Sequence, residues 1–196
     1  MKMSLIERKT LYFNVPGKQN TEAVLRLARE YAQTEEIRDI VVASTTGETG
    51  TAASEVFKGF NLVVVTHHFN FPGPGKHELT EENRQKILGN GAKILTATHA
   101  LSGPERAVSR KFGTLLPLEI IAYTLRRFGE GTKVCVEITL MAADAGLIPV
   151  DRDVITVAGT GRGADTALVI KPASSSDFFD LEVREILAKP RSIKEG

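Results

Sequence analysis

Short apolar runs alternate with amphipathic stretches along the first half of the chain. Four of these runs predict strands, at residues 11–15, 39–43, 61–66 and 93–97. The second and third runs carry almost no polar interruption, which is typical of parallel strands buried on both faces of a sheet. Helical spacing of apolar residues follows each run, and the predicted helices begin at Asn20 or Thr21, within 47–57, at Thr80 and at Ser102. The chain therefore starts with four βα units.

The second half changes its pattern. Helical spacing predicts helices over 117–127 and 132–145, although 134–136 would also suit the start of a strand. Apolar runs at 154–158 and 166–170 predict two further strands. Their connection is too short for a crossover helix, so these two strands should pair antiparallel. The tail from 177 to 189 suits a docked helix or an edge strand equally well.

These elements predict an α/β fold of three layers, α/β/α, around a mostly parallel mixed sheet with an antiparallel strand or hairpin near the C-terminus. We expect a single domain over residues 1–196, because no linker, internal repeat or low-complexity segment interrupts the pattern. In such sheets, ligands bind outside the carboxyl ends of the strands, where the strand order switches direction. The loops at that edge are therefore the places to look for chemistry.

Composition narrows the possible partners. The chain has 25 Lys and Arg against 24 Asp and Glu, so no global charge favours nucleic acid or an anionic membrane. The single cysteine, Cys135, excludes an intramolecular disulfide and a cysteine-built zinc site, and agrees with a reducing cytoplasm. Glu7, Arg8 and Lys9 precede any long apolar run, so we expect neither a signal peptide nor a membrane span at the start. A cytoplasmic protein is the expectation, and a homo-oligomer remains open.

The strongest candidate site is the segment 44–51, between the second strand and its helix. Its hydroxyl groups are neutral donors, its glycines allow close approach of the backbone, and the helix N-terminus favours an anion. We expect a phosphate to bind at Ser44, Thr45, Thr46, Gly47 and Thr49. The segment lacks the Gly-Lys-Ser/Thr ending of a Walker A loop, which argues against nucleoside triphosphate hydrolysis. The alternative is an ordinary βα turn rich in capping residues.

A second glycine-rich segment follows the fifth predicted strand. The spacing of Gly159, Gly161 and Gly163 resembles a dinucleotide fingerprint, but a strand follows where that fingerprint needs a helix. The glycines would suit the backbone wall of a ligand site, and the polar contacts would come from Thr160, Arg162, Asp165 and Thr166. A flexible hairpin tip is the equal alternative.

The loop 67–78 is long enough to be functional rather than merely connective. One of His67 and His68, together with Phe69, would pack on an aromatic ligand; a half-buried histidine at the end of a strand is the equal alternative. No carboxylate or cysteine spacing supports a metal site, and we expect none. Arg106, Arg110 and Lys111 form a basic helix face, for which solvated charge is the default and a second anion contact the minority interpretation.

Nucleophilic catalysis has no positive support. The chain contains no Gly-x-Ser-x-Gly elbow, and Cys135 lies in an apolar stretch without an obvious histidine partner. The residues leave open whether the protein is an enzyme, and no catalytic residue is assigned.

Four segments carry a family resemblance. The run from Phe13 to Thr21, the run from Asp39 to Ala52, and the later segments 141–149 and 159–167 resemble stand-alone prokaryotic proteins related to the C-terminal α/β domain of pyruvate kinase. The resemblance implies that fold, and it implies a phosphate-binding role for the loop 44–51. It also implies flavin mononucleotide (FMN) as the ligand. The kinase barrel has no counterpart here, so we expect no pyruvate kinase activity.

The phosphate loop carries a second resemblance. Ser44, Thr46, Gly47 and Thr49 have the spacing of the flavodoxin phosphate loop, although flavodoxins carry that loop after their first strand. Only the phosphate end of the flavodoxin site therefore transfers to this chain. Both resemblances imply a flavin.

Three functions remain open. The first is FMN binding, with the phosphate on 44–49, the ribityl chain near Asn14, Thr160 and Asp165, and the ring against 67–69 or against Ala100 and Leu101. The second is a non-catalytic regulatory module that senses a sugar phosphate or a related metabolite. The third is a flavin-dependent oxidoreductase, for which the sequence shows no hydride-donor site.

Overall fold

The computed structural model describes residues 5–192. The strands are β1 (Leu11–Phe13), β2 (Asp39–Ala43), β3 (Asn61–Thr66), β4 (Lys93–Thr96), β5 (Val154–Ala158), β6 (Thr166–Lys171) and β7 (Glu182–Pro190). The α-helices are α1 (Thr21–Thr34), α2 (Glu48–Val56), α3 (Glu81–Gly89), α4 (Gly103–Phe112), α5 (Pro117–Leu125) and α6 (Glu130–Asp144). Three short 3-10 helices are η1 (Lys18–Asn20), η2 (Arg126–Phe128) and η3 (Ser175–Asp180).

The strands form one sheet in the order β1-β7-β6-β5-β2-β3-β4. Strand β6 pairs antiparallel with both of its neighbours, and the other pairs are parallel. This confirms the mostly parallel mixed sheet and the antiparallel pairing of β5 with β6. The predicted tail is a strand and not a helix. It is not at the edge either, because β1 pairs with β7 on its outer side.

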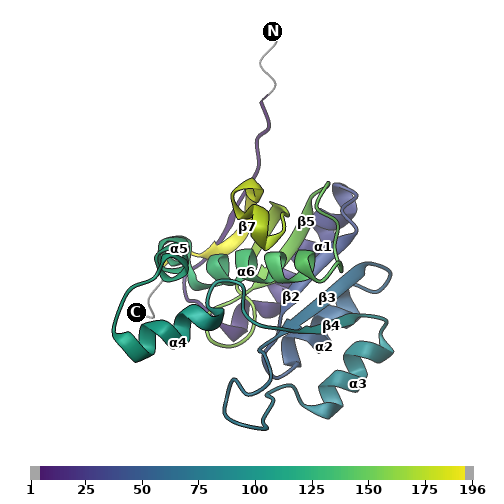
Figure 1. Ribbon diagram of the computed structural model, residues 1–196. Helices are drawn as coiled ribbons and strands as arrows, with labels where there is room; N and C mark the ends of the chain where they lie inside the picture. Colours follow the sequence, from purple (N-terminus) through teal and green to yellow (C-terminus); the bar gives the residue numbers. More distant parts are fainter. Residues whose placement is uncertain (1–4, 193–196) are drawn as a thin grey trace.

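Helices cover both faces of the sheet, which confirms the three-layer α/β/α architecture (Figure 1). On one face, Leu25 of α1, Phe57 directly after α2 and Ile87 of α3 contribute to an apolar layer against the strands. On the other face, α5 and α6 form a second layer with residues such as Ala122 and Leu140. Strands β2, β3 and β5 are buried almost throughout, as their continuous apolar sequences predict.

Two local predictions in the second half are decided by packing. Residues 134–136 belong to helix α6, which lies across the sheet with most of its residues buried, and they do not begin a strand. Ser102 and Glu105 have the spacing of a capping box, but they do not form one at the start of α4. Ser102 has φ −147° and ψ −62° and makes no side-chain cap hydrogen bond, and the Glu105 carboxylate instead accepts a hydrogen bond of 2.9 Å from the amide of Leu118.

The sheet has its switch point between β2 and β5. From β2 the chain moves outward through β3 and β4, with α2 and α3 on one face; it then returns along the other face through α4, α5 and α6 to place β5 on the opposite side of β2. The connections that follow β2 and β5 therefore lie next to each other at the carboxyl edge of the sheet. Both are segments that the sequence identifies as candidate sites.

Candidate functional site

A cavity of about 810 Å³ opens at this carboxyl edge. Its walls come from the segments after β2, β3, β4 and β5 and from the inner faces of α5 and α6. The volume lies towards the upper end of the roughly 300–1,000 Å³ of sites that hold drug-sized ligands. The cavity has two chemically different ends, one lined by hydroxyl groups and glycines and one lined by cations.

The hydroxyl end is the segment that joins β2 to α2. Ser44, Thr45, Thr46 and Thr49 line the cavity, as the sequence predicts for a phosphate site. The Oγ of Ser44 accepts a hydrogen bond of 3.0 Å from the amide of Gly50. Within residues 5–192, the hydroxyls of Thr45, Thr46 and Thr49 make no hydrogen bond to another side chain or to the backbone. Three hydroxyls in this wall are therefore available to a ligand.

Helix α3 holds this segment in place from the outside. Thr46 O accepts hydrogen bonds from the amide of Thr80 at 3.2 Å and from Nδ2 of Asn83 at 3.0 Å. Gly47 has φ 96°, and a Cβ at this position would approach the Asn83 Cβ to 2.4 Å. Gly47 thus permits the turn and its packing on α3, and it does not line the cavity.

The start of α2 adds backbone donors to the same wall. The amides of Glu48 and Thr49 have no backbone acceptor within the described part of the chain, as expected for the first turn of a helix. Glu48 itself is exposed and bonds through Oε2 to the Lys18 Nζ at 2.7 Å. This hydrogen bond, and then the charge of Lys18, lower the pKa of Glu48. The one acidic side chain in this turn is thus paired with a cation.

The glycine segment between β5 and β6 forms the adjacent wall, but its polar side chains are used within the protein. Gly159 and Gly161 line the cavity, whereas Thr160, Asp165 and Thr166 do not. The Asp165 side chain is completely buried. It accepts hydrogen bonds from the amides of Gly17 at 2.9 Å and Thr160 at 3.1 Å and from the Thr166 hydroxyl at 2.8 Å. Asp165 therefore ties the turn before η1 to the β5–β6 connection.

Three other predicted contacts lie outside the cavity. Asn14 is exposed beyond β1. Phe69 is also exposed, and its ring stacks on His77 with the centroids 4.7 Å apart and the planes at 12°. Ala100 packs into the apolar layer of α5 and α6, and its neighbour Leu101 does line the cavity.

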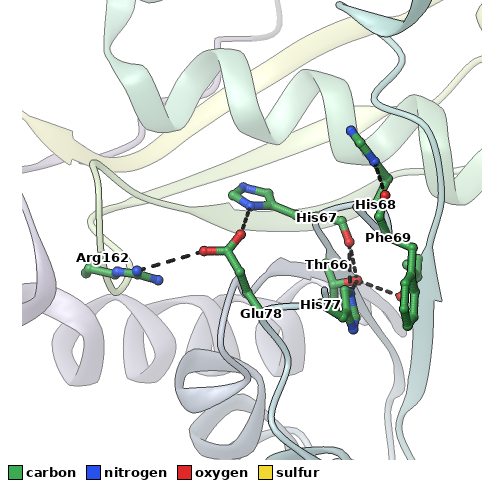
Figure 2. Close-up of polar contacts among 8 residues, drawn as sticks. Thr66, His67, His68, Phe69, His77, Glu78 and Arg162 are labelled. Carbon is green, nitrogen blue, oxygen red and sulfur yellow. Dashed lines mark hydrogen bonds and ion pairs between the residues drawn. The ribbon is translucent and has the colours of Figure 1, made fainter. Parts of the chain in front are cut away.

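The loop after β3 supplies His67 to the cavity as predicted. Figure 2 shows the His67 Nδ1 facing Glu78, with Arg162 on the far side of the same carboxylate. The two distances are 2.6 Å from His67 Nδ1 to Glu78 Oε2 and 4.0 Å from Arg162 to Glu78 Oε1. These contacts join the loop after β3 to the loop after β5. His68 turns away and contacts the carbonyl of Phe69.

An aromatic cluster next to His67 was not anticipated from the sequence. The rings of Phe71 and His67 lie 4.1 Å apart, and the His99 ring lies 5.3 Å from His67 and 5.4 Å from Phe71. All three residues line the cavity. Burial lowers the pKa of His99 to about 4, against an opposing effect of the nearby Glu137 carboxylate. His99 is thus neutral at physiological pH and offers a flat, uncharged surface.

The cationic end is the main feature that the sequence did not reveal. Lys133 and Glu137 form an ion pair on α6, with side chains only 8% and 6% exposed, and both line the cavity. The second carboxylate oxygen of Glu137 accepts a hydrogen bond of 3.0 Å from the amide of Leu101. Arg106 and Arg126 line the same end. Of the predicted basic face on α4, only Arg106 reaches the cavity; Arg110 and Lys111 do not.

A signal for this end was present in the sequence. Lys133 and Glu137 are four residues apart in a helix whose other positions are mostly apolar. A charged pair at that spacing in a buried helix indicates a functional role.

Among residues 5–192 there is no group of three or more His, Cys, Asp or Glu side chains that would hold a metal ion. No helix in that range is both long and apolar enough to cross a membrane.

Fold and cavity together define a doubly covered α/β domain with a polar cavity at the switch point of its sheet. Residues 22–170 match the family model for the pyruvate kinase alpha/beta domain, and the chain belongs to that family. Among solved structures it is similar to pyruvate kinase from Cryptosporidium parvum in complex with ADP, at 16% identity and a TM-score of 0.38 over 76% of this chain and 22% of that chain. Another structure of the same organism's pyruvate kinase matches at 16% identity and a TM-score of 0.35, over 70% and 20% of the two chains. The chain thus spans about a fifth of the length of these enzymes.

Proposed function

We propose that the protein binds a phosphorylated small molecule at the switch point of its sheet, and that this ligand is FMN. The observation that carries the proposal is the wall formed by Thr45, Thr46 and Thr49, which line a cavity of about 810 Å³ and whose hydroxyls have no partner within residues 5–192. Hydroxyls without a protein partner at a cavity wall can hydrogen-bond to a ligand, which takes the place of the water that hydrates them.

The phosphate belongs at the hydroxyl end. The amides of Glu48 and Thr49 and the positive end of the α2 dipole favour an anion there. Lys18 and Arg162 line the same region and add positive charge, while the Lys18 contact offsets Glu48. The site does not need a Walker-type lysine, and the proposal assigns binding to this chain and no phosphoryl transfer.

The flavin ring belongs in the middle of the cavity. Phe71, His67 and the neutral His99 offer faces for stacking, and Leu101 with Met141 adds apolar surface. This placement replaces Phe69 and Ala100 of the sequence-based proposal by Phe71 and His99. When FMN is bound, it supplies redox chemistry that the protein's own groups do not. A flavin-dependent oxidoreductase is therefore the enzymatic form of this proposal.

A second candidate follows from the two polar ends. A sugar phosphate that carries another anionic group would span the hydroxyl end and the cations Arg106, Arg126 and Lys133. The protein would then be a non-catalytic metabolite sensor. In either case we place it in the cytoplasm, because Cys135 is a buried free thiol.

Reconstitution tests the proposal directly. The purified chain is incubated with FMN, freed of excess ligand and examined for flavin absorbance at about 450 nm, a property of the cofactor itself. We expect stoichiometric retention of FMN and a raised melting temperature, because a ligand that binds only the folded state stabilises it. Riboflavin, which lacks the phosphate, is the matched control and should bind more weakly. No retention of FMN, with stabilisation by sugar phosphates instead, would overturn FMN in favour of the metabolite sensor.

A further inference from the structure

Arg106, Arg126 and Lys133 line the cavity together with the carboxylates of Glu119, Glu130 and Glu137, and two of these three cations are held in ion pairs. Lys133 pairs with Glu137, and the Arg126 Nε lies 2.9 Å from the Glu130 Oε2. Arg106 has no carboxylate partner within ion-pair distance among residues 5–192; its guanidinium lies 5.7 Å from the centroid of the Phe71 ring. One cation at this end is thus free for an external anion, and the other two keep unused N–H donors.

Lys133 occupies a place where an apolar side chain would be expected. Helix α6 buries its neighbours Thr132 and Cys135 against the sheet, and the Lys133 residue itself is 6% exposed. Burial of an ion pair costs free energy, and replacing such a pair by apolar residues is often neutral or stabilising. A buried lysine and glutamate at the wall of a large cavity therefore point to a role in binding rather than in stability.

The local charges support that interpretation. Burial lowers the pKa of Lys133, and the positive charges of Arg126 and Arg106 lower it further, against the opposing effect of Glu137. Both guanidinium groups thus act on the charge of Lys133, and an anion bound beside Lys133 would offset their repulsion.

We propose that Arg106, Arg126 and Lys133 form a second subsite that binds the carboxylate of a small organic acid beside the phosphorylated ligand. Guanidinium groups match a planar carboxylate through paired N–H donors, and the ammonium of Lys133 adds a hydrogen-bond donor from a third direction. The volume of the cavity leaves room for such a molecule next to a nucleotide-sized ligand. The apolar side chains of Ile138 and Met141 also line the cavity and suit the carbon skeleton of the acid.

The proposal rests on the proposed function in one respect, which is that the phosphate occupies the hydroxyl end. The alternative is that one ligand with two anionic groups reaches both ends. Separate variants of the two ends distinguish these cases, because independent subsites lose their ligands independently.

The test titrates the ¹⁵N-labelled full chain with sodium lactate and sodium succinate, with and without FMN, and follows amide shifts by NMR. Propane-1,2-diol is the uncharged counterpart of lactate. Arg126→Gln and Arg106→Gln remove the proposed donors, and Arg127→Gln is the matched control because the exposed Arg127 does not line the cavity. Melting temperatures of all variants show whether each is folded. Lys133→Met combined with Glu137→Gln removes the buried charges and keeps an oxygen that can accept from the amide of Leu101.

We expect at least one of the two acids to bind and propane-1,2-diol to leave the spectrum unchanged. Arg126→Gln and Arg106→Gln should each weaken acid binding about tenfold or more, the usual loss for a charge-assisted contact, while Arg127→Gln has no effect. Thr46→Val with Thr49→Val should weaken FMN and leave acid binding intact. If neither acid binds, if Arg127→Gln acts as strongly as Arg126→Gln, or if Arg126→Gln weakens FMN as much as the threonine variant does, the second subsite is wrong. Acid binding without any FMN binding would keep the subsite and overturn the proposed function alone.

Discussion

Two glycine-containing segments lie side by side at the switch point, and they differ in whether their polar side chains are hydrogen-bonded within the protein. In the β2–α2 segment, the hydroxyls of Thr45, Thr46 and Thr49 have no partner within residues 5–192 and face the cavity. In the β5–β6 segment, the carboxylate of Asp165 receives three hydrogen bonds and is sealed from solvent. From the sequence both segments are candidates for binding a ligand, and the β2–α2 segment is the stronger one.

The difference shows how polar residues in a loop divide between architecture and binding. The β5–β6 segment has to turn between two antiparallel strands and also pack on η1, and a Cβ on Gly159 would come within 2.5 Å of the Gly163 carbonyl oxygen. Its polar groups form the hydrogen bonds that stabilise that turn. The β2–α2 segment is held from outside by α3, and within residues 5–192 the hydroxyls of Thr45, Thr46 and Thr49 have no partner. Four predictions test this division.

The largest expected effect is on stability, from Asp165→Ala. The substitution leaves the amides of Gly17 and Thr160 and the Thr166 hydroxyl without their acceptor, and each such loss costs about 1–3 kcal/mol. We expect the free energy of unfolding to fall by about 3–5 kcal/mol in a urea titration. Asp165→Asn keeps one acceptor oxygen and should lose less. A stable Asp165→Ala protein that no longer binds FMN would instead make Asp165 a ligand contact.

The next effect is on binding, from Thr46→Val combined with Thr49→Val. These nearly isosteric changes remove two hydroxyls that face the cavity, and contacts to a charged group are worth about 1.5–3 kcal/mol each. We expect FMN affinity, measured by fluorescence quenching, to fall by a factor of about 100 or more, with little change in melting temperature. Thr51→Val is the control, since the Thr51 hydroxyl bonds to Asn83 and does not line the cavity. Unchanged affinity in the double variant would move the phosphate elsewhere.

A smaller effect concerns pH and His99, which lies near His67, His68, Lys133 and Glu137. Its pKa is about 4 in the folded protein, against about 6.5 when unfolded, so the unfolded state binds the proton more readily. The stability contribution is present above pH 6.5 and is lost as the pH falls towards 4. Between pH 7 and pH 5, we expect the free energy of unfolding of the wild type to fall by about 1 kcal/mol more than that of His99→Phe; this figure allows for the partly exposed ring.

Chemical denaturation at several pH values measures this difference. Above pH 7 the two proteins should show the same dependence on pH, which serves as the internal control. If the free energy of unfolding of both proteins changed equally between pH 7 and pH 5, His99 would not be held neutral by its surroundings.

The smallest effect is expected from Glu48→Gln. Glu48 is exposed, so loss of its contact with Lys18 should not measurably change the melting temperature. The change removes a negative charge beside the proposed phosphate and frees a cation, so FMN affinity should rise by a factor of a few at low salt. The gain should disappear at high salt. Weaker binding in the variant would mean that Glu48 contacts the ligand directly.

Much of the fold could be predicted because its central strands are buried on both faces. The bounds of β2, β3 and β5 agree with the predicted runs 39–43, 61–66 and 154–158, where apolar residues follow one another almost without interruption. The tail was ambiguous because β7 carries exposed charge over its first half and is buried only near its end, where it runs between β6 and β1. That pairing depends on residues almost the whole chain apart.

By itself the sequence determined the βα order, the three-layer architecture and a hydroxyl-rich turn at the start of α2, because these follow from local spacing and from continuous apolar runs. Only the tertiary structure decided which polar groups stay free. In the folded protein, Asp165 and Thr166 are hydrogen-bonded in a buried network, and Phe69 stacks on His77. Lys133 and Glu137 of α6 line the cavity together with Arg106 and Arg126. Hydrogen bonds and ion pairs between distant segments depend on how helices pack on the sheet, and no local pattern encodes that packing.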